Sequence, residues 1–319
     1  MQPARSAVLR HLIWLLEAPS LLSDASGLPL FPSTRRRSAV HRLQSTLTAL
    51  AADDSELQNH VQNRPSHRLG HYYERLVDYW LRNDPSFELI AAGRQIAQAG
   101  NTVGEIDFLI RDLETSRLLH IETAVKFYIG LSPTSDLEHW YGRSRNYKFR
   151  YKLDHLANRQ LGILDRPEAA ETREALGIHA DASIDSVVLM QGRLYYPLMP
   201  DSTGSPLMAA DPSWRRRPSP DAIHPEAERG WHIAIDKLAT LRSASALRWA
   251  IVTGPDILYP DPGIDELTWL DYRSMLDRLS RSDADLPQAV IVTAGDGTVS
   301  HGYVLGTDWR TTPGHASRE

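Results

Sequence analysis

The chain contains no cysteine among its 319 residues, so disulfide bonds and thiolate metal sites are excluded. This absence fits a reducing compartment. Long apolar runs are missing too, since none approaches the roughly 18 residues of a membrane-spanning helix. The apolar run HLIWLL near the N-terminus is short, and Glu17 follows it where a secretory signal would have small residues. We therefore expect a cytoplasmic protein without a membrane partner.

Positive charge is not in excess, because 40 acidic residues outnumber 35 basic ones and give a formal net charge of −5. This balance argues against a wholly basic nucleic-acid-binding protein, but it leaves room for a local basic groove. A hydrophobic content of 42% and a charged content of 24% are ordinary for a globular protein, so a sizeable core needs no metal to hold it together. The length predicts one large domain or two modest ones.

Hydrophobic periodicity and composition divide the chain into four regions. We expect helices packed on the core over 1–60, the core itself over 61–200, a loop or insertion rich in Pro, Ser, Asp and Arg over 201–229, and a C-terminal α/β extension over 230–319. The clearest helix covers 67–82, where apolar residues recur at three- and four-residue spacing. The other expected elements are helices at 8–22, 39–52, 233–241 and 265–280, a helix in the second half of 140–161, and strands at 87–97, 104–110, 120–129, 185–198, 246–254, 288–295 and 298–306.

Two of these strands, GEIDFLI (104–110) and HIETAVKFYI (120–129), carry acids within an apolar pattern. Because side chains alternate between the two faces of a strand, the polar and apolar groups are sorted onto opposite faces. The polar face carries Glu105, Asp107, His120, Glu122 and Lys126. This charged face is either an ordinary solvated sheet surface or the wall of a functional site.

The short connection between the two strands predicts their register. A two-residue turn at Glu114-Thr115 would pair residues whose numbers sum to 229, which sets Asp107 directly opposite Glu122 with about 5 Å between the bases of the side chains. Opposed carboxylates repel each other, so we expect a divalent cation, a nearby ammonium group or a raised pKa to offset the cost. Ligands that are all oxygen favour a hard ion such as Mg²⁺ or Mn²⁺.

The residues that follow these strands are unusually basic. Between Trp140 and Leu153 there is no acid, and four tyrosine or phenylalanine residues are interleaved with the cations. The basic residues of this run are Arg143, Arg145, Lys148, Arg150 and Lys152. Cations with aromatic neighbours suit a phosphodiester chain beside an acidic metal site, whereas a solvated helix face is the ordinary alternative.

These residues resemble a known enzyme superfamily. An aspartate followed about fifteen residues later by glutamate and lysine on an adjacent strand resembles the PD-(D/E)XK nucleases, and GEIDFLI is similar to the GEID strand of several members. More narrowly, RLGHYYERL, GEIDFLI, HIETAVKFYIG, WYG and KLDHLANRQL together resemble the bacterial family called domain of unknown function 1853, over most of the chain. The resemblance implies an α/β fold, with a restriction-endonuclease-like core in which helices flank a central mixed sheet.

The resemblance also implies a site, residue by residue. Asp107 and Glu122 match the superfamily's two metal-binding acids, and Glu74 matches an acid that many members contribute from the preceding helix. Lys126 matches the catalytic lysine. Together these residues would hold Mg²⁺ or Mn²⁺ and hydrolyse nucleic acid, with DNA favoured over RNA. The residues expected to contact the nucleic acid are Arg143, Arg145, Lys148, Lys152 and Gln160.

One position departs from the superfamily's pattern. The lysine normally comes two residues after the glutamate, but Ala124 occupies that position and Lys126 lies two residues further on, about 6.6 Å along the strand. Two alternatives to an active nuclease therefore stay open. One is a nucleic-acid-binding module that kept the fold without the catalysis, and the other is a scaffold protein whose C-terminal half binds other proteins. The oligomeric state is open as well.

Overall fold

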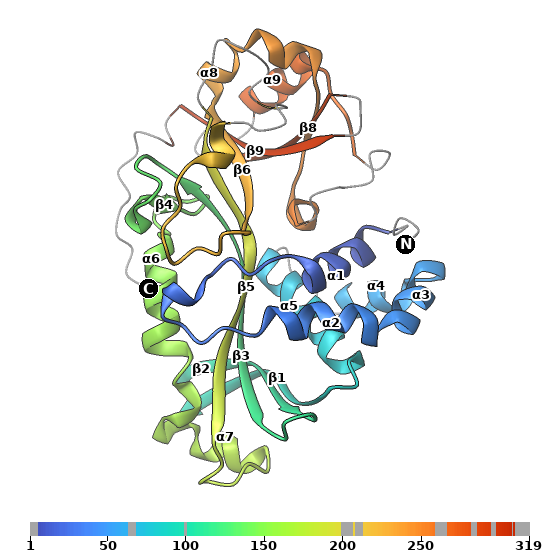
Figure 1. Cartoon of the computed structure of the whole chain (residues 1–319), viewed down its shortest axis with the longest axis vertical. Coiled ribbons are helices and arrows are strands. Elements are labelled where there is room, and N and C mark those ends of the chain that lie inside the picture. Colours follow the sequence, from blue (N-terminus) through green and yellow to red (C-terminus); the bar gives the residue numbers. More distant parts are fainter. Residues whose placement is uncertain are drawn as a thin grey trace. The chain divides into compact units, whose positions relative to one another are not determined.

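The computed structural model describes residues 6–62, 68–98, 101–198, 207, 213–258, 267–281, 286–294, 298–307 and 309 (Figure 1). The fold is α/β, as predicted. Among these residues the helices are α1 (Ala7–Glu17), α2 (Ser33–Arg42), α3 (Gln44–Ala52), α4 (Ser55–Gln62), α5 (Leu69–Asn83), α6 (Phe149–His155), α7 (Ala170–Ala175), α8 (Ile235–Leu238) and α9 (Tyr272–Ser280). The strands are β1 (Phe87–Gln98), β2 (Asn101–Asp112), β3 (Leu118–Gly130), β4 (Trp140–Tyr141), β5 (Ile184–Pro197), β6 (Glu228–Ala234), β7 (Arg248–Ile251), β8 (Gln288–Thr293) and β9 (Val299–Leu305).

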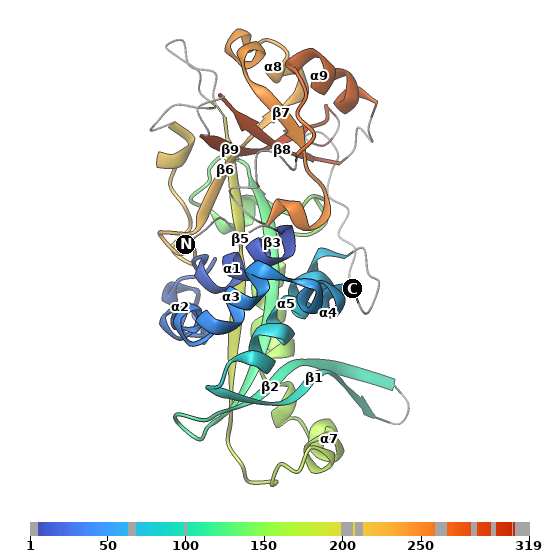
Figure 2. The ribbon, with the colours of Figure 1, turned by 90° about the vertical axis from the view of Figure 1, so that its right-hand side faces the viewer.

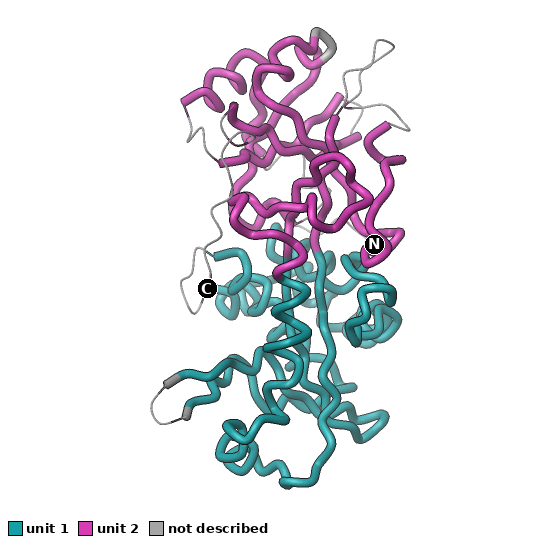
Figure 3. Tube along the Cα trace, turned by 90° about the vertical axis from the view of Figure 1, so that its left-hand side faces the viewer, with its two compact units in different colours: residues 1–125, 152–191 teal, residues 126–151, 192–319 magenta. Residues whose placement is uncertain are grey.

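The described strands form one mixed sheet with the hydrogen-bonded order β1-β2-β3-β5-β6-β9-β8-β7, and β4 pairs with β3. The chain divides into two compact units, 1–125 with 152–191 and 126–151 with 192–319 (Figure 3). The long strands β3 and β5 contribute residues to both units. Of the predicted insertion at 201–229, residues 201–206 and 208–212 lie outside the described part of the chain, and its last two residues begin β6.

Helix α5 of the first unit is the amphipathic helix predicted at 67–82. Most of its apolar side chains are buried, Tyr73 and Trp80 completely, while Leu69 and Tyr72 are half-buried. The helix ends at a polar cap, because the indole N–H of Trp80 donates to the Asp84 carboxylate (3.0 Å) and Pro85 follows. Figures 1 and 2 show α1 to α5 gathered into one helical group.

Helix α1 ends at Glu17, earlier than the predicted 8–22, because the chain after it pairs with strand β5 of the same unit. The backbone N–H of Leu21 donates to Met190 O (2.8 Å). The C-terminal carbonyls of α1 are also satisfied from α2, since the buried guanidinium of Arg36 donates to Leu15 O (2.5 Å) and to Ala18 O. A helix end that is buried needs such partners for its last carbonyl groups.

Strands β2 and β3 form the predicted antiparallel pair, and the predicted register is confirmed. The pairs run from Phe108–Ile121 to Arg111–Leu118, which all sum to 229. The connection is longer than the predicted two-residue turn: Asp112 N donates to Arg117 O (2.9 Å), and the carboxylate of Asp112 accepts from the backbone N–H of Glu114 (2.9 Å) and of Thr115 (3.2 Å). Both turns have an even number of residues, so the register is the same.

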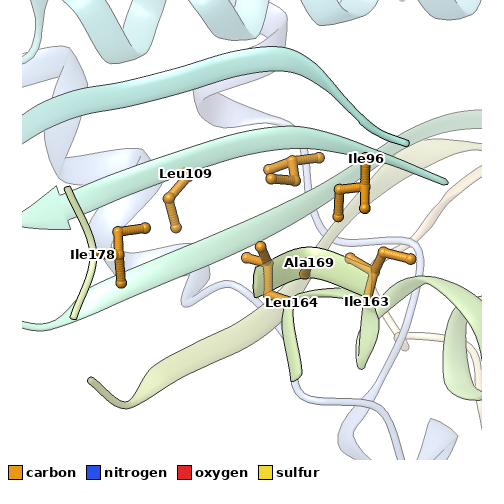
Figure 4. Packing of buried hydrophobic residues seen from close by; sticks show 7 residues of the cluster. Ile96, Leu109, Ile163, Leu164, Ala169 and Ile178 are labelled. Atoms are coloured by element: carbon orange, nitrogen blue, oxygen red, sulfur yellow. The ribbon is translucent and has the colours of Figure 1, made fainter. Parts of the chain in front are cut away.

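An apolar cluster covers one face of β1 and β2 in the first unit (Figure 4). The segment between α6 and α7 supplies Ile163 and Leu164, which pack with Leu109 of β2 and Ile96 of β1. Gly104 allows this close packing, because a Cβ there would lie 2.8 Å from Cδ1 of Ile163. Leu109 and Ile96 are therefore fully buried beneath this segment.

In the second unit, strand β6 runs parallel to both β5 and β9, while β9, β8 and β7 are antiparallel neighbours. The helix predicted at 233–241 is wrong in part, because the chain stays in β6 through Ala234 and only Ile235–Leu238 is helical. The packing of Trp231 stabilises β6 as a strand. Its ring is fully buried against Gly302 of β9, where a Cβ would lie 2.3 Å from the ring. No helix in the described part of either unit is long and apolar enough to cross a membrane.

Candidate functional site

Asp107 and Glu122 come together where β2 and β3 meet in the first unit. Continuing the observed register by one residue sets Asp107 opposite Glu122, as predicted. The Asp107 carboxylate accepts two hydrogen bonds from Thr123, one from the backbone N–H (2.8 Å) and one from the hydroxyl (3.1 Å). Asp107 is half-buried and Glu122 is fully buried. The solvated sheet surface, one of the two interpretations of this face, is therefore wrong at Glu122.

The pKa of Asp107 is raised to about 7. Burial is the largest cause, the charge of Glu122 comes next, and the hydrogen bonds from Thr123 act in the opposite direction. The charge of Glu74 raises the pKa further. A raised pKa is one of the three ways in which the sequence predicts that opposed carboxylates are tolerated. At neutral pH the Asp107 carboxyl group consequently exchanges its proton readily.

Glu74 reaches this site from α5. Its side chain is half-buried, and its effect on the pKa of Asp107 shows that its charge acts on that carboxyl group. Gly70 lies one helical turn earlier, but a Cβ at that position would lie 3.9 Å from Oε1 of Glu74, which is an ordinary contact, so the position of Glu74 does not require this glycine. In the first unit, two of the three predicted acids, Glu122 and Glu74, therefore act on the carboxyl group of the third, Asp107.

Gln160 holds the other acid. Its side-chain amide donates to Oε2 of Glu122. Gln160 is placed there by a π-helical turn, Leu156–Gln160, which continues α6 and in which Leu161 N donates to Leu156 O (3.1 Å). Such wide turns are rare in helices and occur frequently at functional sites.

The side-chain amide oxygen of Gln160, Oε1, also has hydrogen-bond partners. It accepts from the ammonium group of Lys152 (2.7 Å) and lies 3.0 Å from Nδ1 of His155. Because an amide oxygen only accepts, His155 carries its proton on Nδ1 in this contact. These bonds fix which end of the amide faces Glu122. The structure thus brings together two residues that the sequence predicted as contacts for nucleic acid, Lys152 and Gln160.

His120 is a site residue to which the sequence assigned no role. Its ring is fully buried, with Nε2 lying 3.0 Å from Oε1 of Glu122 and Nδ1 lying 3.1 Å from the hydroxyl of Ser186 on β5. The angles at the His120–Glu122 contact are not those of a hydrogen bond, and neither atom has a hydrogen-bond partner among the described residues. The sequence did contain one signal for a role of His120 in the site: it lies two residues before Glu122 and therefore on the same face of the strand.

The family model described as domain of unknown function (DUF1853) matches residues 10–294. The chain belongs to this family. Comparison with curated proteins found no match, and comparison with solved structures found none either. The match spans both units of the DUF1853 chain, including Glu74, Asp107 and Glu122.

The remaining predicted residues of the DUF1853 chain lie in the second unit. Lys126 is half-buried on β3, four residues after Glu122, and Gly192 packs on its backbone. The predicted basic residues of the second unit already contact other groups of that unit: Arg143 and Arg145 contact Trp309, and Lys148 contacts Glu138.

The backbone carbonyl of Arg143 accepts from the indole N–H of Trp309 (2.7 Å), and Arg145 donates to Trp309 O (3.4 Å). The ammonium group of Lys148 lies 3.1 Å from the Glu138 carboxylate, which raises the pKa of Lys148. The guanidinium of Arg145 also lies 5.2 Å from the ring centroid of Tyr141. The side chains of Arg145 and Lys148 are therefore held in place at the surface of the second unit, whereas Arg143 is bonded through its backbone and its side chain is exposed.

The acids of the first unit have the chemistry of a site for a hard cation. Among the described residues, no group of three or more His, Asp or Glu side chains is arranged to hold a metal ion. The donor set nevertheless fits, because Glu122 offers a buried oxygen without a hydrogen-bond partner and the pKa of Asp107 is raised by two neighbouring carboxylates. A divalent cation would offset that repulsion. Asp107 and Glu122 are the acids whose oxygens such a cation would meet, and among the described residues Glu74 does not complete a three-acid ligand set with them.

Proposed function

We propose that this protein is a metal-dependent nuclease that hydrolyses phosphodiester bonds in nucleic acid, with DNA favoured over RNA. The observation that carries the proposal is the placement of Asp107 opposite Glu122 at the junction of β2 and β3, where burial and then the charges of Glu122 and Glu74 raise the pKa of Asp107. Active sites use such perturbed groups. The resemblance of GEIDFLI and HIETAVKFYIG to the strands of PD-(D/E)XK nucleases supports the same assignment.

Each residue has a distinct part in this proposal. Asp107 and Glu122 bind Mg²⁺ or Mn²⁺, and the bound ion supplies Lewis-acid activation of a water molecule and of the scissile phosphate. Gln160 orients the Glu122 carboxylate through the hydrogen bond that it donates. Lys126 stabilises the negative charge that develops on the phosphate, which is the part that the resemblance gives to the lysine.

The pKa of Asp107 makes metal binding depend on pH. Because carboxylates bind cations in their deprotonated form, Asp107 must lose its proton before it can serve as a ligand. With its pKa at about 7, this loss occurs between roughly pH 6 and pH 8. We therefore expect the affinity for Mn²⁺ to rise across that range. Isothermal titration calorimetry at several pH values measures this directly, without any nucleic acid.

The decisive experiment measures cleavage and metal binding together. Labelled single-stranded and duplex DNA and RNA are incubated with the purified protein in Mg²⁺, in Mn²⁺ and in EDTA. Cleavage should require a metal and should be lost in Asp107→Asn and Glu122→Gln, and both variants should bind Mn²⁺ more weakly. Glu105→Gln is the matched control, since Glu105 is an exposed acid two residues before Asp107 on the same strand. Absence of cleavage with both metals, or cleavage that survives Asp107→Asn, contradicts the proposal.

A nucleic-acid-binding module without catalysis is the second candidate. It is favoured by the surroundings of Glu122, because a cation must compete with Gln160 for Oε2 and must share the space at Oε1 with the imidazole of His120, which lies 3.0 Å away. Ala124 at the position of the usual lysine points the same way. This candidate predicts binding that weakens with salt, needs no metal and is unchanged by Asp107→Asn.

A further inference from the structure

Two tyrosine side chains at the start of α6 are exposed to solvent, although the phenylalanine between them is buried. Tyr147 is 64% exposed and Tyr151 is 51% exposed, whereas Phe149 between them has no exposed surface. Among the described residues, Leu113 and Leu286 are the other large hydrophobic side chains that are exposed. The second unit therefore presents two tyrosine rings to solvent within five residues of one another.

The backbone at both tyrosines is fixed. The ring of Phe149 stacks on Tyr128 with the centroids 4.3 Å apart and the planes at 13°, which fixes the start of α6. Two helical residues turn by about 200°, so Tyr151 points away from the side on which Phe149 is packed. Tyr147 is fixed by a tight turn, in which Gly142 N donates to Tyr147 O (2.7 Å) and Tyr147 N donates to Ser144 O (3.1 Å).

Positive charge lies beside these rings. The ammonium group of Lys148 is 5.8 Å from the ring centroid of Tyr151 and 5.8 Å from that of Tyr141. Glu138 is the acid that pairs with the cations here, at 3.1 Å from Lys148 and 3.4 Å from Arg150. Residues 139–153 contain five Lys or Arg and no Asp or Glu, so the surface keeps a positive excess after this pairing.

We propose that Tyr147 and Tyr151 form a stacking surface for unpaired bases, and that this protein binds single-stranded nucleic acid there. Proteins that bind single strands combine aromatic side chains, on which bases stack, with cations that follow the phosphates. A duplex keeps its base faces stacked on one another, so it offers these rings no partner. The proposal rests on the proposed function for the kind of polymer, and it adds that the polymer is single-stranded.

Fluorescence anisotropy with labelled oligonucleotides of about 20 nucleotides, single-stranded or duplex, tests this surface. EDTA is present throughout, so that binding is measured without cleavage. Stacking of one base changes affinity by at least about fivefold, so Tyr147→Ala and Tyr151→Ala should each weaken single-strand binding by that factor. Duplex binding should stay within about twofold. Lys148→Ala should weaken both and lower the dependence on salt, because it removes a phosphate contact.

Matched variants separate the ring from the rest of the side chain. Tyr147→Phe and Tyr151→Phe keep the aromatic face and should bind single strands as the parent does. Leu113→Ala removes an exposed apolar group of the first unit and should change nothing. The inference is overturned if the alanine variants bind single strands like the parent, if the phenylalanine variants lose as much as the alanine variants, or if duplex binding falls equally.

The experiments can reject the nuclease proposal and the stacking-surface proposal independently of each other. A protein that binds single strands through its tyrosines in EDTA but never cleaves with Mg²⁺ or Mn²⁺ keeps the stacking surface and loses the nuclease. A protein that cleaves, but whose alanine variants bind unchanged, keeps the nuclease and loses the stacking surface.

Discussion

Nε2 of His120 lies 3.0 Å from Oε1 of Glu122, and both side chains are fully buried in the first unit. A buried carboxylate is costly unless positive charge or hydrogen bonds compensate it. On one side of the pair, Ser186 contacts the other ring nitrogen of His120. On the other side, Gln160 donates to the other oxygen of Glu122. The pair is therefore the centre of a polar chain that joins β3, β5 and the π-helical turn.

Removing the imidazole should destabilise the protein substantially. His120→Ala leaves a cavity and leaves Glu122 with Gln160 as its compensating group, so we expect the free energy of unfolding to fall by about 2–4 kcal/mol. Urea denaturation followed by circular dichroism measures the loss. His179→Ala is the control, because the side chain of His179 is 83% exposed and should contribute less than about 0.5 kcal/mol. Equal losses in the two variants would show that the buried pair contributes nothing.

Asp107 should make the stability of the protein depend on pH. In the unfolded chain this carboxyl group titrates near pH 4, whereas in the folded protein its raised pKa is about 7. Between these values the folded state holds a proton that the unfolded state has lost, so stability falls as the pH rises through this window. Asp107→Asn removes the effect. The free energy of unfolding of the variant relative to the parent should therefore be higher at pH 8 than at pH 5, by on the order of 2–3 kcal/mol.

Urea denaturation at both pH values, without divalent cations, measures that difference. Glu105→Gln serves as the control, since Glu105 is an exposed acid of the same strand and should show no such change between pH 5 and pH 8. If Asp107→Asn behaves like Glu105→Gln at both pH values, the carboxyl group titrates normally in the folded protein.

The central hairpin could be predicted from the sequence because its information is local. The alternation of GEIDFLI and HIETAVKFYI gives the faces, and any turn of even length gives the same register. The two-residue turn was nevertheless wrong, because the carboxylate of Asp112 stabilises a longer loop by accepting from Glu114 and Thr115. The opposed pair Asp107 and Glu122 follows from the register alone.

The partners of that pair could not be predicted, because they come from distant parts of the chain. Ser186 is 66 residues from His120, and Gln160 is 38 residues from Glu122. The π-helical turn that delivers Gln160 has no signature in the pattern of apolar residues. Strand β6 was missed for a related reason, because the glycine and the tryptophan of ERGWHIA have partners that are distant in sequence: a Cβ at Gly230 would lie 2.6 Å from the ring of Tyr195, and the ring of Trp231 packs on Gly302 of β9.

Arg36 should be a major structural residue of the N-terminal helices, although it lies within a run of three arginines. Its guanidinium is buried and donates to the carbonyls of Leu15 and Ala18, which close α1. Burial lowers its pKa to about 10, so it stays charged at neutral pH. Arg36→Met should lower the free energy of unfolding by about 1–3 kcal/mol, because it leaves the buried carbonyl of Leu15 without its donor, while Ala18 O keeps the hydrogen bond from the side-chain amide of Gln191 (2.9 Å). Thermal and urea denaturation measure this.

The neighbouring arginine gives the matched control. Arg37 is exposed on the same helix, so Arg37→Met should change stability by no more than about 0.5 kcal/mol. A comparable loss in both variants would point to the propensity of α2 rather than to the carbonyls of α1.

Gly192 should tolerate no other residue. Its φ is +140°, and a Cβ at this position would lie 1.7 Å from Lys126 O, where β5 passes β3 in the second unit. Gly192→Ala must therefore move one strand away from the other, and we expect it to lose about 4 kcal/mol or more, or to accumulate as insoluble protein. Gly177→Ala separates this overlap from backbone strain, since Gly177 also has a positive φ (+68°) but nothing within 4 Å of an added Cβ. It should lose only about 1–2 kcal/mol and stay soluble. The solubility and the thermal unfolding of the two variants, measured side by side, distinguish these causes. If both variants lose the same stability, strain at positive φ, and not the contact with Lys126, is the reason for the glycine.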